Sequence, residues 1–543
     1  MEPDLRSISI DVMPKIKPLK IDEMFTNATR WSSSTPVVMH RPPSPPRKPR
    51  ILPLPNPLRD ADQGVSPLAG LFEHHELLPL VMVHFEHPRE LASLARVNKA
   101  FCEYAQKKLY QNIWVRPWEE GCRLKVRDAG YSSLIKRLGQ SAPSSGSVVV
   151  LIPALEVRFF PFGTSEQKQQ ELEKNIQTAF KHMQNLEHLV WTVRGFVAKI
   201  ADPVLTRYIQ RDKSLTDSIV ELISALPKLH HLEISGRSDR HFDPYLLAQM
   251  KTLKDLRIMM PDHTFRDALS SITSELSRRP QGGLRGLALV SQKSPLITDA
   301  VLMALAPHLH QLKRFTLWGA TRATQDGVIA VLRHARHLED LSVDDSYHTG
   351  MKDLSLAPIL PCLHTFSLSF RLEARTPARP DVSMPCLPPG IEGLRCLHLT
   401  AQNGPQEISI DSLHDLDKQI NLTTLRKISL LNLDMSQATL ACLMQKTPRL
   451  EELYISVQER SVVFDCKALR GSTLRILNIN SPDVAPPSMG DLVALAKRMP
   501  ALEELGHGNR VYEVHRHFED EESVVELFRW SKPSIPGYFQ IWR

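Results

Sequence analysis

Four tight histidine pairs are the residues whose types and spacing come nearest to a catalytic or metal site. They are His74-His75, His230-His231, His308-x-His310 and His515-x-His517. A structural or catalytic zinc ion needs three or four ligands, and none of these pairs has a second pair at metal-site spacing. The sequence also lacks G-x-x-x-x-G-K-[ST], G-x-G-x-x-G, G-x-S-x-G and H-E-x-x-H. We therefore expect no catalytic residue, no bound metal and no cofactor.

The cysteines and the charge balance narrow the class of protein further. Seven cysteines without a C-x-x-C pair favour a reducing compartment over a disulfide framework. A net charge of +7 over 543 residues is mild for a nucleic-acid binder. No apolar run approaches the roughly 20 residues that cross a bilayer, and no secretory signal is visible. The sequence predicts an intracellular protein, cytoplasmic or nuclear, that binds neither nucleic acid nor membrane.

One phrase, L-x-x-L-x-L, recurs along most of the chain. It begins at Leu186, Leu229, Leu253, Leu284, Leu312, Leu338, Leu363, Leu394, Leu425, Leu450, Leu474 and Leu502. From Leu229 to Leu502 there are 273 residues over ten steps, or 27.3 per repeat. Segments between the phrases have helical spacing, for example 298–309 and 488–499, and each starts near a capping residue. The pattern resembles the leucine-rich repeat and predicts an α/β solenoid of short parallel strands plus helices.

The phrase also predicts which residues face a partner. The first, fourth and sixth positions point into the core, so the third, fifth and seventh cover the concave face, the default binding surface of a solenoid. We select ten candidates for binding a target there: Asp255, Arg257, Arg314, Trp318, Asp340, Asp344, His398, Lys427, Glu452 and Tyr454. Trp318 and Tyr454 are expected to be exposed anchors. Alternatively Trp318 packs against a neighbouring loop, because a slip of one residue exchanges the two faces.

Three short helices are expected before the repeats. One apolar stripe predicts the first helix and consists of Leu77, Leu78, Val81, Met82 and Phe85; Pro88 starts a second helix, and Asn98 caps a third. The sequence here resembles the F-box, the adaptor-binding module of cullin-based ubiquitin ligases, in the form found in many fungal proteins. The resemblance is carried by Glu76-Leu77-Leu78, Phe85-x-x-Pro88-Arg89-Glu90-Leu91, the run 91–98, Phe101 and Leu109-Tyr110-x-x-Ile113-Trp114. The usual opening Leu-Pro-x-Glu lacks its proline here, which weakens the expected adaptor affinity.

The resemblance implies a substrate receptor that performs no catalysis itself. The helices would dock a Skp-type adaptor bound to a cullin, and the solenoid would hold an unknown target protein. The implied adaptor contacts are Leu77, Val81, Phe85, Pro88, Leu91, Val97 and Phe101. Two other hypotheses stay open: a repeat scaffold outside any ubiquitin ligase, with the helices as a cap, and an enzyme with an unrecognised site.

The remaining segments complete the expected organisation. Residues 1–68 hold 13 of the 41 prolines and predict a disordered tail. Its PxxP pattern could dock an aromatic groove, Ser44-Pro45 has the form of a phosphorylation site, and a solvated linker is the simplest alternative. The expected order is the tail at 1–68, the F-box-like module at 71–115, a linker or first capping repeat at 116–180, the solenoid at 181–510 and a C-terminal cap at 511–543. In the cap, the acidic run 519–522 predicts the start of a helix.

Overall fold

The computed structural model describes part of the chain. The described residues are 78, 80, 85, 88–97, 99–115, 152–157, 166–191, 215–236, 242–279, 283–345, 347, 349–371, 384–402, 406–481, 487–508, 510–519 and 522–530. Two compact units, Met1–Leu71 and Phe72–Arg543, divide the chain, and every described residue belongs to the second. The predicted tail at 1–68 therefore lies outside the described residues.

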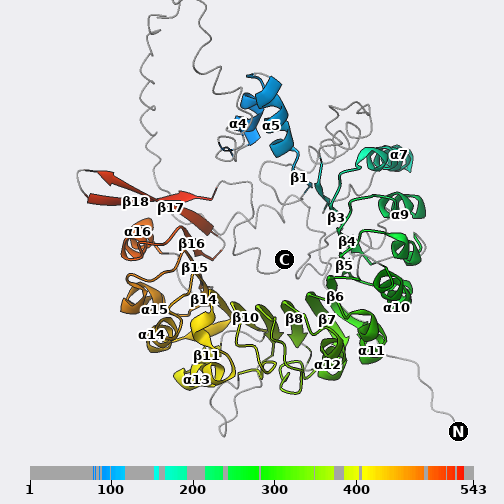
Figure 1. The fold of residues 1–543 in the computed structure, drawn as a ribbon. Coiled ribbons are helices and arrows are strands. Elements are labelled where there is room, and N and C mark those ends of the chain that lie inside the picture. Colours follow the sequence, from blue (N-terminus) through cyan, green and yellow to red (C-terminus); the bar gives the residue numbers. More distant parts are fainter. Residues whose placement is uncertain are drawn as a thin grey trace, which may run out of the picture. The chain divides into compact units, whose positions relative to one another are not determined.

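Sixteen strands form one sheet among the described residues, and each strand pairs with its neighbour in the sheet order (Figure 1). The first eight are β1 (Asn112–Val115), β2 (Ala154–Val157), β3 (His188–Trp191), β4 (His231–Ser235), β5 (Asp255–Met259), β6 (Gly286–Thr298), β7 (Arg314–Arg322) and β8 (Asp340–Asp345). The others are β9 (Thr365–Phe370), β10 (Cys396–Ala401), β12 (Lys427–Leu431), β14 (Glu452–Ser456), β15 (Ile476–Asn480), β16 (Glu504–His507), β17 (Arg510–Glu519) and β18 (Glu522–Arg529). A small parallel pair, β11 (Gln406–Ile408) with β13 (Leu433–Met435), lies apart from this sheet.

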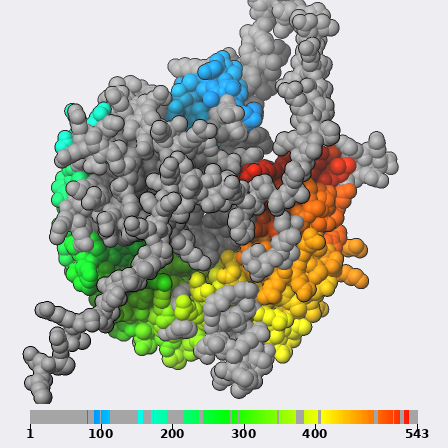
Figure 2. All heavy atoms as spheres, turned by 180° about the vertical axis from the view of Figure 1, so that it is seen from behind, coloured from blue at the N-terminus to red at the C-terminus, as the bar shows by residue number. Residues whose placement is uncertain are grey.

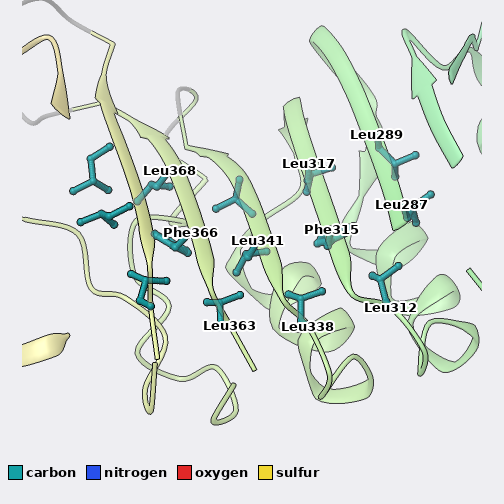
Figure 3. Close-up of a cluster of buried hydrophobic side chains, with 14 of the residues drawn as sticks. Leu287, Leu289, Leu312, Phe315, Leu317, Leu338, Leu341, Leu363, Phe366 and Leu368 are labelled. Carbon is teal, nitrogen blue, oxygen red and sulfur yellow. The ribbon is translucent and has the colours of Figure 1, made fainter. Parts of the chain in front are cut away.

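All twelve predicted phrases form strands, and consecutive phrases pair in parallel with matching positions opposite each other. Leu341, Phe366 and Leu397, the fourth residues of three phrases, are aligned across β8, β9 and β10. The side chains of Leu341 and Phe366 stack in layers with those of the flanking phrases, as Figure 3 shows. The parallel pairing confirms the prediction of an α/β fold with a solenoid-like repeat. This architecture fits the sequence, because a period near 27 residues leaves room for one strand and one return segment.

Helices return the chain from one strand to the next and lie on the outer side of the sheet (Figure 1). They are α7 (Glu166–His182), α9 (Asp217–Ser224), α10 (His263–Ser277), α11 (Asp299–Leu305), α12 (Gln325–His334), α13 (Ile410–Gln419), α14 (Gln437–Lys446), α15 (Ser461–Phe464) and α16 (Met489–Arg498). Short 3-10 turns occur at η3 (Pro244–Gln249), η4 (Ala306–His308), η5 (Leu422–Thr424) and η6 (Lys467–Leu469). The two helices expected at 298–309 and 488–499 are confirmed as α11 and α16, the latter with a capping box between Ser488 and Asp491.

Between β8 and β9 the described residues form turns instead of a helix. The buried carboxylate of Asp345 organises this connection. It accepts hydrogen bonds from the Thr349 hydroxyl at 3.0 Å and from the backbone N–H groups of Met351 and Lys352, both at 3.2 Å. One side chain therefore satisfies backbone donors that a helix would otherwise have paired.

Two segments differ from or extend the expectation. The helix predicted after the acidic run is wrong, because β17 and β18 form an antiparallel hairpin at the end of the sheet. Pairing with β17 decides the outcome, since Val524, Val525 and Phe528 are residue types that suit a strand once a partner strand is present. Before the first phrase, β2 lies within the segment 116–180 and α7 begins in it and ends at His182; β2 extends the parallel sheet. Viewed from behind, the repeats follow one another as a continuous series from green to orange (Figure 2).

Candidate functional site

A small helical module precedes the repeats, and it has its own core. It contains α4 (Pro88–Leu94) and α5 (Lys99–Leu109). Leu78, Leu91, Phe101 and Ala105 are buried together, and Phe85 is packed against them. Two of the predicted adaptor contacts, Leu91 and Phe101, therefore hold the module itself together, because their side chains are covered by its own helices.

The apolar side chains that the module leaves exposed are different ones. Val97, a predicted adaptor contact between the two helices, is 62% exposed. Leu80, which is not among the predicted contacts, is 64% exposed. It lies off the stripe that suggested the first helix, so helical periodicity alone passes over it. Of the other predicted contacts, Pro88 is the first residue of α4, and Leu77 and Val81 lie outside the described residues.

The ten predicted target-binding residues lie on the face of the sheet opposite the helices, which we call the inner face. Each is next in sequence to a buried core residue of its strand, as Trp318 is to Leu317 and Asp344 to Val343. Parallel pairing aligns them in rows across the strands, for example Lys427 of β12 opposite Glu452 of β14. These residues take part in three groups of contacts.

The first group is Lys427, Glu452 and Tyr454. The Lys427 ammonium lies 2.8 Å from Glu452 Oε2, and the Tyr454 hydroxyl donates to the same oxygen at 2.9 Å. Lys427 Nζ is also 5.2 Å from the centre of the Tyr454 ring. Burial, and then the charge of Glu452, raise the pKa of the Tyr454 phenol. The phenol therefore acts as a hydrogen-bond donor that fixes the Glu452 carboxylate between a cation and a hydroxyl.

Removing that hydroxyl should weaken the fold measurably. We expect Tyr454→Phe to lower the free energy of unfolding by about 1–2 kcal/mol, because a charge-assisted hydrogen bond is lost while the ring stays in place. Urea denaturation of the full chain measures the change. Tyr245→Phe is the matched control: the Tyr245 side chain is largely exposed, so its free energy of unfolding should stay unchanged. Equal effects of the two substitutions would contradict this role of Tyr454.

The prediction that Tyr454 is exposed is wrong, since the residue is 0% exposed. His398 and Asp344 are buried as well. The reason lies in the rows: Tyr454 stands between Ser429 and Asn478 on the adjacent strands, and these smaller side chains leave room for its ring. Adjacent strands are only about 4.8 Å apart, so neighbours in a row cover one another. Burial, and then the charge of Lys427, lower the pKa of His398 to about 3.

The second group surrounds Trp318 at the end of β7. Its indole N–H donates to the Ser342 hydroxyl on β8 at 3.0 Å, and the side chain is partly buried. Gly319 follows with φ 66°, a left-handed conformation that favours glycine, and its N–H donates to Asp344 Oδ2 at 3.1 Å. Trp318 is thus held by the neighbouring strand, which agrees better with the packing alternative than with a free anchor.

The third group is an ion pair that spans two strand intervals. Arg314 of β7 reaches Asp255 of β5 at 2.5 Å, across Gly286 of β6. A Cβ at Gly286 would lie 2.1 Å from Asp255 Oδ1, so the pair needs glycine there. Arg257 lies 3.7 Å from Glu233 on β4. Asp340, the remaining candidate, is partly exposed at the start of β8, opposite Arg314.

Two further findings concern only the described ranges. They contain no group of three histidine, cysteine, aspartate or glutamate side chains that could hold a metal ion. No helix within them is both long enough and apolar enough to span a membrane.

The fold thus defines a repeat protein built of parallel strands and helices. No protein-family model matches the chain. No curated protein matches it either. Among solved structures the chain is similar to one described as the crystal structure of the Rad7 and Elc1 complex in yeast: the two are 13% identical over 76% of this chain and 98% of that one, with a TM-score of 0.36. We draw no conclusion from a similarity at this TM-score, and the architecture is defined by the strand pairing of this chain.

Proposed function

We propose that this chain is the substrate-recognition subunit of a Skp-cullin-F-box type ubiquitin ligase. The module of α4 and α5 is the F-box and docks a Skp-type adaptor, and through it a cullin. The leucine-rich-repeat solenoid holds the target protein on its inner face. On this proposal the chain performs no catalysis and raises the effective concentration of the target near a ubiquitin-charged enzyme. A cytoplasmic or nuclear location accords with that role.

The exposure of Val97 and Leu80 carries the proposal. Both are large apolar side chains with more than 60% of their surface exposed, and they belong to the module whose described core residues are Leu78, Leu91, Phe101 and Ala105. An adaptor that covers Val97 and Leu80 would remove this apolar surface from water, which favours binding.

A second candidate function is a repeat scaffold outside any ubiquitin ligase. One observation favours it: Tyr110 and Ile113, at the end of α5 and in β1, pack against the core of the repeats. Contacts of this kind are expected of a helical cap that protects the first strand. The two candidates differ in whether the exposed residues of the module bind an adaptor.

The test is binding of the full chain to a purified Skp-type adaptor. We expect Val97→Asp to weaken binding at least about tenfold, because a charge would be desolvated in an apolar contact. The thermal midpoint should stay unchanged, since Val97 contributes little to the core. Isothermal titration calorimetry and a thermal melt on the same preparation measure both quantities.

Leu356→Asp is the matched control, because Leu356 is an apolar residue of the repeats that is 73% exposed. That variant should bind the adaptor as the unmodified chain does. Leu91→Asp, by contrast, places a charge in the core of the module and should lower its stability as well as its binding. No binding by the full chain, or undiminished binding by Val97→Asp, would reject the proposal and leave the scaffold.

A further inference from the structure

The second residue of each phrase stands directly before its strand, and these residues form one row along the sheet, which we call the strand-start row. Its members are Glu187, His230, Lys254, Arg285, Lys313, Glu339, His364, Arg395, Arg426, Glu451, Arg475 and Glu503. The N–H of each member after the first donates to the carbonyl of the member before it, at 2.7–2.9 Å. The side chains of the row are therefore neighbours about 4.8 Å apart.

Along part of this row each cation is followed by an acid that neutralises it. Lys313 lies 2.5 Å from Glu339, and Arg475 lies 2.8 Å from Glu503. Arg426 is paired in the same way with Glu451, at 3.3 Å. Opposite charges on adjacent strands stabilise a sheet, and like charges destabilise it.

The pattern breaks at Lys254, Arg285 and Lys313, which are three consecutive cations on adjacent strands. In the part of the chain that the structure describes, neither Lys254 nor Arg285 has an ion pair or a side-chain hydrogen bond, and Arg285 is exposed. Asp255, the residue that follows Lys254, is already paired with Arg314. Lys313 is balanced by Glu339, so the cations left without an internal partner are Lys254 and Arg285.

We propose that Lys254, Arg285 and Lys313 bind an acidic segment of a partner protein. The three cations span about 10 Å, the length of roughly three residues of extended peptide. A nucleic-acid duplex presents a charge about every 1.7 Å along its axis, so three cations about 4.8 Å apart would neutralise only part of the charge that they face. The proposal rests on the strand register and the charges alone, so it holds whether or not the helical module binds an adaptor.

The experiment uses the full chain and a fluorescently labelled hexaglutamate peptide at low salt. We expect the double variant Lys254→Ala, Arg285→Ala to weaken binding about tenfold, as two exposed charge contacts are lost. The double variant Arg395→Ala, Arg475→Ala removes the same charge from the same row and should bind within about twofold of the unmodified chain. Equal losses in both double variants, no binding of the peptide, or tighter binding of a single-stranded oligonucleotide of equal charge would overturn the proposal.

A thermal melt gives a second, independent readout. Arg285→Glu places an acid between Lys254 and Lys313, and should raise the Tm by about 2 °C while abolishing peptide binding. Arg475→Glu instead places a third acid between Glu451 and Glu503 and should lower the Tm. A lower Tm for Arg285→Glu would show that the three cations do not repel one another, and would contradict the premise.

Discussion

Replacing Phe366 with alanine lowers the free energy of unfolding by about 3–5 kcal/mol, the range for deleting a buried aromatic ring. Phe366 lies in β9 and is fully buried, beside Leu341 of β8 (Figure 3) and opposite Leu397 of β10 in the strand register. The substitution opens a cavity in the middle of the stack, where layers on both sides limit how far the core can collapse. Urea denaturation followed by circular dichroism measures the loss.

Two controls separate the cavity from a general effect of losing a ring. Phe366→Leu introduces the residue that most other phrases carry at this position, and should cost less than half as much. Phe528→Ala removes a ring that is half exposed on β18, and should change the free energy of unfolding by less than about 1 kcal/mol. A loss at Phe366 no larger than that at Phe528 would contradict the continuous core.

Acid should unfold this protein in part through one buried histidine, His398. Its pKa is about 3 in the folded chain, below the ordinary value of 6.5, so the unfolded chain takes up the proton first. The contribution of the neutral His398 imidazole to the free energy of unfolding is fully present above pH 6.5, and it declines as the pH falls toward 3. At pH 4.5, two units below the ordinary value, the decline amounts to about 3 kcal/mol.

We therefore expect His398→Leu, which cannot titrate, to lose about 3 kcal/mol less than the unmodified chain between pH 7 and pH 4.5. Urea denaturation at the two pH values measures this difference. His515→Leu is the matched control, because the His515 side chain is 55% exposed. An identical pH dependence in the unmodified chain and His398→Leu would contradict the assignment.

Much of the fold followed from local pattern. The L-x-x-L-x-L phrase predicted the positions of twelve strands. Within a phrase, the fourth and sixth residues fall on the same side of a strand and can be buried together. Between phrases, about 27 residues allow the chain to return and place the next strand alongside. In the helical module, Pro88 and Asn98 predicted the starts of α4 and α5. The resemblance gave Leu91 and Val97 the same role as adaptor contacts and could not separate Leu91, which is buried in the module, from Val97, which is exposed. A sequence pattern identifies apolar residues and says nothing of which of them a neighbouring helix covers.

The sequence by itself determined which side chains point into the core and which lie on the inner face, since alternation along a strand is a local property. Only the tertiary structure decided what those inner-face residues do. Tyr454 is buried because strand pairing places it between Ser429 and Asn478, and Arg314 finds Asp255 because Gly286 leaves the space between them open. These partners come from other repeats, and the C-terminal hairpin likewise depends on a strand that pairs back. Contacts between side chains far apart in the chain depend on which strands become neighbours, and no local pattern carries that information.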